Sequence, residues 1–157
     1  MTLRATRLFN ALSAAVAPED LEQRVAVLRK TDVFSHVPKH ELSVLATMFE
    51  ERTFAAGEAV FRQGDAAAEV HAIAEGTLEL SRDGAVVGTA GPGQVVGEYG
   101  MFASMHRTAT VVSRGPSKTL ALDYQRFRRF LLAFPESALA LLNLTVERLI
   151  EQRRGWA

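Results

Sequence analysis

Residues 97–111 read Gly-Glu-Tyr-Gly-Met-Phe-Ala-Ser-Met-His-Arg-Thr-Ala-Thr-Val, a stretch with one carboxylate, Glu98, and one guanidinium nine residues later, Arg107. Gly91 and Gly93 precede it, and the glycine-rich run invites comparison with nucleotide-binding loops. The spacing fits neither common loop, because Val96 occupies the third glycine position of G-x-G-x-x-G and no Gly-Lys-Ser/Thr follows. The run keeps a backbone that can approach an anion closely.

Short apolar runs separated by glycines surround this stretch. Residues 59–62, 70–74, 77–81 and 85–89 alternate with Gly57, Gly64, Gly76 and Gly84, and two further strands are expected at 108–113 and 118–122. Closely spaced turn signals of this kind are typical of a small antiparallel sandwich or barrel. The dipeptide Asp83-Gly84 lies between two of the runs and predicts a tight hairpin turn.

Helical periodicity flanks the strands on both sides. Pro18 begins one expected helix and Pro38 lies near the start of a second, while Asp123 and Pro135 precede two more. The apolar positions of the four helices are Leu21, Val25 and Leu28; Leu42, Leu45, Ala46 and Phe49; Phe127, Phe130, Leu131 and Phe134; and Leu139, Leu142, Val146, Leu149 and Ile150. The predicted fold is therefore mainly β with flanking helices: N-terminal helices, a β-roll, then two C-terminal helices.

Composition narrows the function classes. The 157 residues are 48% hydrophobic, which allows one folded domain with a buried core. Eighteen basic residues balance eighteen acidic ones, so the field that draws a protein onto a polyanion is missing and nucleic acid is not expected as a direct partner. Cysteine is absent, which fits a reducing compartment, and we expect a cytoplasmic location.

The N-terminus combines Arg4 and Arg7 with a fairly apolar run from Leu8 to Ala17, a pattern shared by signal peptides. Asn10 and Ser13 interrupt the run, and its apolar residues recur at helical spacing. An amphipathic helix is therefore preferred over export. No stretch reaches the roughly 18 apolar residues that span a membrane, so membrane insertion is not expected.

Motifs for metal binding and catalysis are missing. His36 and His40 share a helical spacing with Pro38 between them, and solvated surface is the default for such a pair. His40-Glu41 has no second histidine at the zinc-protease spacing, and no serine is bracketed as Gly-x-Ser-x-Gly. We predict neither a metal site nor an enzyme.

Residues 97–111 resemble the phosphate-binding cassette of the cyclic-nucleotide-binding domains found in the protein kinase A regulatory subunit, the catabolite activator protein and cyclic-nucleotide-gated channels. The resemblance covers about residues 33–154, with Gly57-Glu58, Gly64-Asp65, Gly76 and Gly93 where the family places its turns. It implies a cyclic-nucleotide-binding domain at 33–157, preceded by an N-terminal helical segment at 1–32.

The family pattern gives roles to individual residues. It implies that Glu98 accepts a hydrogen bond from the ribose 2′-hydroxyl, that Arg107 pairs with the cyclic phosphate, and that backbone amides after Glu98 complete the anion cradle. The implied ligand-binding residues of the cassette are Gly97, Glu98, Tyr99, Gly100, Arg107, Thr108 and Ala109. Tyr99 replaces the usual aliphatic residue and Val96 replaces a frequent phenylalanine, departures that bear on affinity. The alternative is that Glu98 and Arg107 form a surface or structural ion pair and bind no ligand.

Two interpretations remain open for the other implied contacts. Thr108 contacts phosphate or guanine in the family, or is an ordinary strand threonine, and alone it does not separate cAMP from cGMP. Gln152 and Arg153 align with positions in the helical lid that covers the base, and Trp156 is placed to stack, or all three belong to a solvated helix end.

The leading hypothesis is a non-catalytic, allosteric regulatory module. It binds a cyclic nucleotide, cAMP before cGMP, with no metal, and signals through movement of its C-terminal helix. The expected partner is a protein effector or a second copy, which binds through the N- or C-terminal helices. The alternative keeps the fold without the ligand, as a scaffold for protein interaction or dimerisation. A DNA-binding regulator is disfavoured by the neutral charge and by the absence of a helix-turn-helix after the lid.

Overall fold

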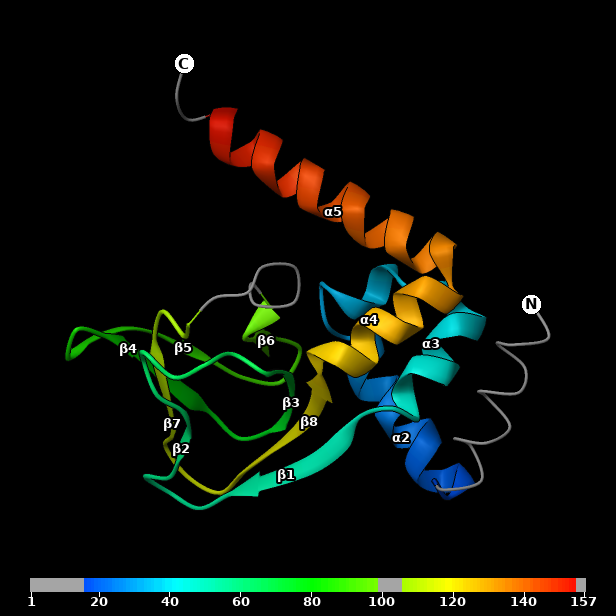
Figure 1. Cartoon of the computed structure of the whole chain (residues 1–157). Helices are drawn as coiled ribbons and strands as arrows, with labels where there is room; N and C mark the ends of the chain where they lie inside the picture. Colours follow the sequence, from blue (N-terminus) through cyan, green and yellow to red (C-terminus); the bar gives the residue numbers. More distant parts are fainter. Residues whose placement is uncertain (1–15, 99–105, 155–157) are drawn as a thin grey trace.

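The structure is a computed structural model, and it describes residues 16–98 and 106–154. Helices lie at both ends of this range and strands lie between them (Figure 1). The helical elements are α2 (Pro18–Arg29), η1 (Phe34–His36), α3 (Lys39–Ala46), α4 (Tyr124–Ala133) and α5 (Pro135–Arg154). The strands are β1 (Glu50–Phe54), β2 (Ala59–Phe61), β3 (Glu69–Glu75), β4 (Leu78–Arg82), β5 (Ala85–Ala90), β6 (Val95–Val96), β7 (Thr110–Ser113) and β8 (Ser117–Asp123).

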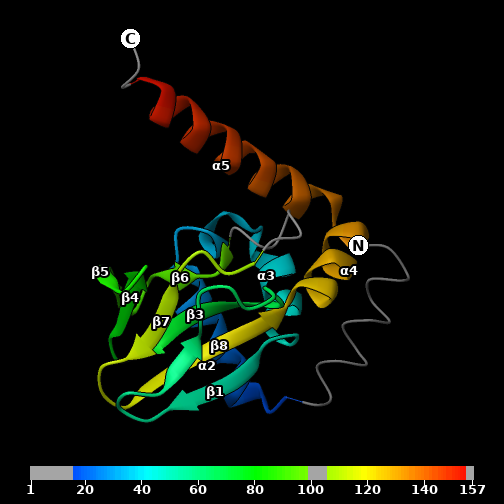
Figure 2. The same ribbon diagram turned by 60° about the vertical axis from the view of Figure 1, so that its left-hand side comes forward.

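The strands form two four-stranded sheets with antiparallel pairing throughout, in the orders β1-β8-β3-β6 and β2-β7-β4-β5 (Figure 2). This arrangement confirms the predicted fold class. The Asp83-Gly84 turn joins β4 to β5 with positive φ at both residues, 52° and 81°, as a type I′ hairpin requires. The short strands β1 and β6 carry no strong period-2 pattern and are additions to the prediction.

Two groups of buried side chains hold the layers together. Between the sheets lie Ile73, Leu78, Ala90, Val96 and Val111. The larger group joins the helices to β3 and β8 and is centred on aromatic rings, with Phe34 meeting Phe49 edge to face at 5.3 Å and Phe127 at 6.2 Å. Burial of these rings fixes the helices against one end of the roll.

The first three predicted helices occur at the predicted places. Phe49, assigned to the stripe of the second helix, lies beyond the end of α3 because the chain leaves the helix at Thr47. It is nevertheless buried. Arg24 of α2 donates from Nη1 to the carbonyl oxygens of Ala46 and Phe49, at 3.3 and 2.7 Å, and so ties α2 to the end of α3.

The last helix differs from its prediction in which face it buries. The stripe Leu139, Leu142, Val146 and Leu149 was expected to pack, but these side chains are exposed, Leu139 to 59% and Leu142 to 58%. Ser137 and Leu141 of α5 are buried instead. The physical reason is a bend of 115° between α4 and α5, after which α5 runs away from the other helices (Figures 1 and 2).

No single helix among the described residues is long and apolar enough to cross a membrane, although α4 and α5 together, across their bend, have the length and composition to do so. The apolar run at residues 8–17 falls largely outside the described residues, as does Trp156.

Candidate functional site

The cassette begins where β6 ends. Gly97 follows Val96 with φ of +83°, a conformation that favours glycine. Space also requires glycine here, because a Cβ would lie 2.5 Å from Arg107 Nη1 and 3.0 Å from the Glu69 carbonyl oxygen. Gly97 therefore lets the cassette backbone approach the arginine. Tyr99 and Gly100, predicted to continue the anion cradle, lie outside the described residues.

Arg107 is held by its backbone on both sides. Its amide donates to the Asp65 carbonyl oxygen at 2.7 Å, and its own carbonyl oxygen accepts from Gly64 N at 2.9 Å. The neighbouring residue His106 forms an isolated β-bridge with Ala66. The Gly64-Asp65 turn, which the sequence predicted only as a turn, thus places the arginine.

The Arg107 guanidinium is almost fully buried, with 9% of the residue exposed. It stacks over the Phe61 ring, with Cζ 3.9 Å from the ring centroid. Nη2 donates to the Glu69 carbonyl oxygen at 2.6 Å, and Nη1 donates to the Tyr124 hydroxyl at 3.0 Å. Nε is buried and has no hydrogen-bond partner among residues 16–98 and 106–154. A buried unpaired donor costs roughly 1–3 kcal/mol, so this nitrogen fits an anionic oxygen supplied by a ligand.

A cavity of about 270 Å³ opens beside this guanidinium. It brings together five residues predicted from the sequence, Gly97, Glu98, Arg107, Thr108 and Ala109. Apolar side chains of both sheets supply part of the remaining wall, with Phe61, Leu80, Val96 and Val111 among them. Arg82 and His106 also line it and were not predicted. An apolar wall with a few convergent polar groups is the usual make-up of a small-molecule site.

A second, larger cavity of about 560 Å³ lies between β6 and α5. Glu98 lines both cavities, and Gln152, a predicted lid residue, lines the second one with it. Arg153, the other predicted lid residue, is exposed and lines neither cavity. The structure therefore brings Gln152, but not Arg153, to the same space as the cassette.

Glu98 is half-buried, and its surroundings alter its acidity. Burial raises the pKa of the Glu98 carboxyl above its usual range, against the lowering effects of its own backbone amide and of the Arg148 charge. The Asp32 carboxylate raises the same pKa further. Arg148 of α5 donates to Asp32 Oδ2 at 2.7 Å, so an ion pair links α5 to the turn after α2 beside Glu98.

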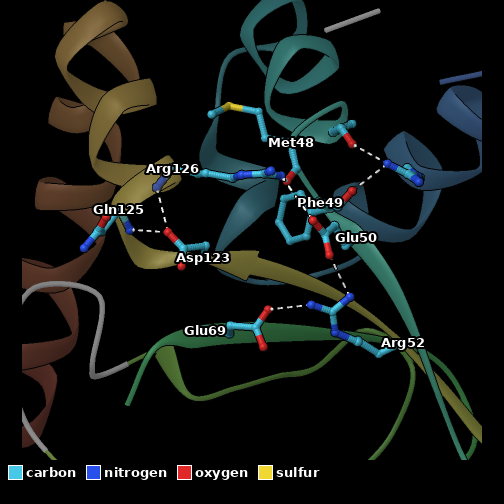
Figure 3. A network of polar contacts seen from close by, with 10 residues as sticks. Met48, Phe49, Glu50, Arg52, Glu69, Asp123, Gln125 and Arg126 are labelled. Carbon is cyan, nitrogen blue, oxygen red and sulfur yellow. Dashed lines mark hydrogen bonds and ion pairs between the residues drawn. The ribbon is translucent and has the colours of Figure 1, made fainter. Parts of the chain in front are cut away.

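A network of polar contacts supports the backbone that holds Arg107 (Figure 3). The carboxylate of Glu69, whose carbonyl accepts from Arg107, pairs with Arg52 Nη2 at 3.1 Å, and Arg52 Nη1 reaches Glu50 at 2.8 Å. Asp123 Oδ1 accepts from the amides of Gln125 and Arg126 at 2.8 and 3.1 Å and caps α4. Both β3 and the start of α4 are therefore fixed where they touch the guanidinium.

His71 lies near the arginine, behind Phe61. It is buried, its Nδ1 shares a hydrogen bond of 2.9 Å with Thr119 Oγ1, and its ring lies 6.1 Å from that of Phe61. Burial, with the charges of Arg107 and Arg52, lowers the pKa of His71 to about 4. The histidine is therefore neutral at pH 7. No group of three or more potential metal ligands occurs among residues 16–98 and 106–154.

The fold and the pocket define a class of protein: a β-roll that offers one buried arginine and one carboxylate to a small ligand, with helices at both ends. The chain belongs to the cyclic nucleotide-binding domain family, whose model matches residues 51–134. This confirms the resemblance drawn from residues 97–111.

The names of individual relatives differ in whether they state dependence on cAMP. The cAMP-dependent protein kinase regulatory subunit of Dictyostelium discoideum is 33% identical over 110 residues, which are 65% of this chain and 34% of that protein. The N-terminal domain of a transcriptional regulator from Streptomyces coelicolor has a TM-score of 0.77 and 28% identity over 82% of this chain and 95% of that one. The regulatory subunit of a cAMP-independent protein kinase A from Trypanosoma brucei shares the fold, with a TM-score of 0.69 and 22% identity over 82% of this chain and 48% of that one.

The chain spans between a quarter and about a third of the length of the curated relatives it matches. Sequence reasoning missed the groups that hold the guanidinium, Glu69 and Tyr124, and the ion pair of Asp32 with Arg148. No motif marks any of them, because each meets its partner only through the fold.

Proposed function

We propose that this chain is a sensor domain that binds a cyclic nucleotide, cAMP in preference to cGMP, and catalyses no reaction. The observation that carries the proposal is the buried Arg107, whose Nε has no partner in the described part of the chain and whose side chain lines the same pocket as Glu98. A buried cation with an unpaired donor is expensive unless an anion completes it. A cyclic phosphate carries one negative charge and two free oxygens, which suit a guanidinium.

The two charged residues divide the ligand between them in this proposal. The phosphate lies against Arg107, and the ribose 2′-hydroxyl donates to Glu98. A carboxylate close to a phosphate repels it, so Glu98 is useful only on the sugar side, where an anionic acceptor binds a hydroxyl strongly. The base then extends toward the larger cavity beneath α5, where Gln152 lies. Tyr99, Gly100 and Arg153 remain proposed contacts.

The preference for cAMP rests on the Dictyostelium relative, whose name states cAMP dependence. The trypanosome protein named as cAMP-independent has the same fold, so the preference has to be measured. Thr108 lines the pocket, where its hydroxyl serves either phosphate or guanine.

We further propose that the signal leaves through α5, toward a protein effector or a second copy. Among the described residues, the Arg148–Asp32 ion pair holds the C-terminal half of this helix, and Arg148 also acts electrostatically on Glu98. A ligand hydroxyl at Glu98 and a base beneath Gln152 change the balance of those contacts. Binding energy that differs between two positions of α5 then moves the helix. We also propose that the protein is located in a reducing compartment, the cytoplasm.

A scaffold that binds no nucleotide is the second candidate, and the exposed apolar stripe of α5 favours it. Calorimetric titration with cAMP, cGMP and 5′-AMP separates the two. We expect micromolar or tighter binding of cAMP, weaker binding of cGMP, and a rise in melting temperature at saturation, since ligand at 100 times its Kd adds about 2.7 kcal/mol.

Hydrogen exchange with and without cAMP tests the helix movement. We expect added protection in the cassette and also in α5 from residue 146 onward. Protection confined to the cassette would leave the ligand but refute the role of α5. The absence of heat and of a melting shift with both cyclic nucleotides would favour the scaffold.

A further inference from the structure

Tyr124 is the first residue of α4 and touches both sides of the proposed phosphate site. Its hydroxyl accepts from Arg107 Nη1 at 3.0 Å and donates to the carbonyl oxygen of Gly97. One phenol thus joins the guanidinium, the start of the cassette and the helix that leads to α5. Sequence reasoning assigned this residue no role.

The two contacts fix which partner the hydroxyl donates to and which it accepts from. A phenol has one proton to donate, and the Gly97 carbonyl takes it, so the oxygen faces Arg107 only as an acceptor. The backbone of Tyr124 is fixed as well, since its amide donates to the Ala68 carbonyl oxygen at 3.0 Å and Asp123 caps the helix behind it. The acceptor that meets Nη1 is therefore held in place and oriented.

The guanidinium has little freedom left once these contacts form. The Glu69 carbonyl holds Nη2 at 2.6 Å and the Phe61 ring covers one face at 3.9 Å. With Tyr124 on Nη1, the described residues hold the group at two of its three nitrogens, and Nε is the one that has no partner among them. The guanidinium is a rigid plane with five N–H donors, so fixing the positions of Nη1 and Nη2 also fixes the position of Nε.

We propose that Tyr124 is a positioning residue for the phosphate site: its hydroxyl locks the Arg107 guanidinium so that Nε remains the donor for the ligand's phosphate. The inference rests on the proposed function, since it needs a phosphate to meet Nε. Nε is shielded from water in the empty protein, so a local opening of the pocket wall accompanies ligand entry. Burial raises the pKa of the Tyr124 hydroxyl, which keeps it protonated at pH 7.

The test replaces the hydroxyl alone, with Tyr124→Phe, in protein labelled with ¹⁵N. The Arg107 Nε–H signal is identified by its loss in Arg107→Lys. In the empty wild type we expect this signal to exchange slowly with water, and in Tyr124→Phe to exchange at least about tenfold faster, since the guanidinium is held at one nitrogen fewer. Cyclic AMP affinity should fall by roughly tenfold, as expected for the loss of one hydrogen bond worth about 1.4 kcal/mol.

Thr47→Val is the matched control, because it also deletes one buried hydroxyl, which donates to the Val44 carbonyl oxygen outside both cavities. It should lower stability without changing Nε exchange or affinity. A merely structural role for Tyr124 predicts the same pattern for Tyr124→Phe and would overturn the inference.

Tighter binding by Tyr124→Phe would overturn it in another way, since Tyr124 would then compete with the phosphate for Arg107. A loss of affinity with unchanged Nε exchange would also count against positioning. If the wild type binds neither cAMP nor cGMP, the proposed function fails, and the locking of Arg107 is judged on Nε exchange in the empty protein alone.

Discussion

The two ends of the proposed ligand site are built differently. At the phosphate end, Arg107 is buried, anchored by its backbone to the Gly64-Asp65 turn and supported by Glu69 and Tyr124. At the opposite end, α5 leaves the domain with its apolar stripe exposed, and an ion pair on the surface joins its distal half to the turn after α2. Recognition of charge needs groups fixed in advance, whereas an output element needs two positions of similar free energy.

The largest effect is expected at the rigid end. Arg107→Ala should weaken cAMP binding by roughly 30- to 5,000-fold, or about 2–5 kcal/mol, because it leaves the phosphate desolvated without its cation. Calorimetry measures this, with Arg114→Ala as the control, since Arg114 is an exposed arginine that pairs with Glu79 outside the pocket. Equal affinity for wild type and Arg107→Ala would show that the site has been assigned to the wrong residue.

His71 lies at the same rigid end, and its protonation should lower the free energy of unfolding. Its pKa is about 4 in the folded protein and near 6.5 when exposed, so the unfolded chain binds more protons between these values. The histidine's contribution to stability is therefore fully present above about pH 6.5 and lost as the pH falls toward 4. The loss amounts to about 3 kcal/mol.

Urea unfolding at several pH values checks this, compared with His71→Gln, which lacks the titrating ring. The difference in unfolding free energy between the two proteins should shrink as the pH falls. Parallel curves would mean that His71 is not desolvated as the structure has it.

Glu98 stands between the two ends, lining both cavities. Glu98→Ala should cost about 1.5–3 kcal/mol of cAMP binding, the usual value for a hydrogen bond to a charged group. The 2′-deoxy form of cAMP should lose affinity for wild type but little further for this variant. If the 2′-deoxy form loses as much affinity for Glu98→Ala as it does for wild type, the ribose lies elsewhere. Glu79→Ala, on the surface, controls for the removal of one negative charge.

The smallest effect is expected at the exposed ion pair. Asp32→Asn should change the free energy of unfolding by less than about 1 kcal/mol, since exposed pairs are worth little. Hydrogen exchange in the distal half of α5 should nevertheless become faster, because that half loses its tie to the turn after α2. Glu79→Gln breaks a comparable exposed pair with Arg114 and should leave α5 unchanged. A large loss of stability in Asp32→Asn would contradict the contrast between the two ends.

The fold could be predicted from the sequence wherever a local sequence pattern is compatible with only one local structure. Asp83-Gly84 specifies a two-residue hairpin because both positions need positive φ, and the structure has that turn. Pro18 and Asp123 mark helix starts that the structure confirms, Asp123 through its side-chain cap. The cassette residues Gly97, Glu98, Arg107, Thr108 and Ala109 line one pocket, and their role as ligand contacts stays a prediction.

The tertiary structure alone decided the face of α5 and the partners of Arg107. A helix with apolar residues at 139, 142, 146 and 149 as well as at 141 and 144 has two faces that can be buried, so periodicity does not choose between them. The Arg107 contacts join residues 17 and 38 positions apart, to a phenol and to a backbone carbonyl. A hydrogen bond of that kind depends on where two strands and a helix meet, and residue spacing carries no information about that meeting point.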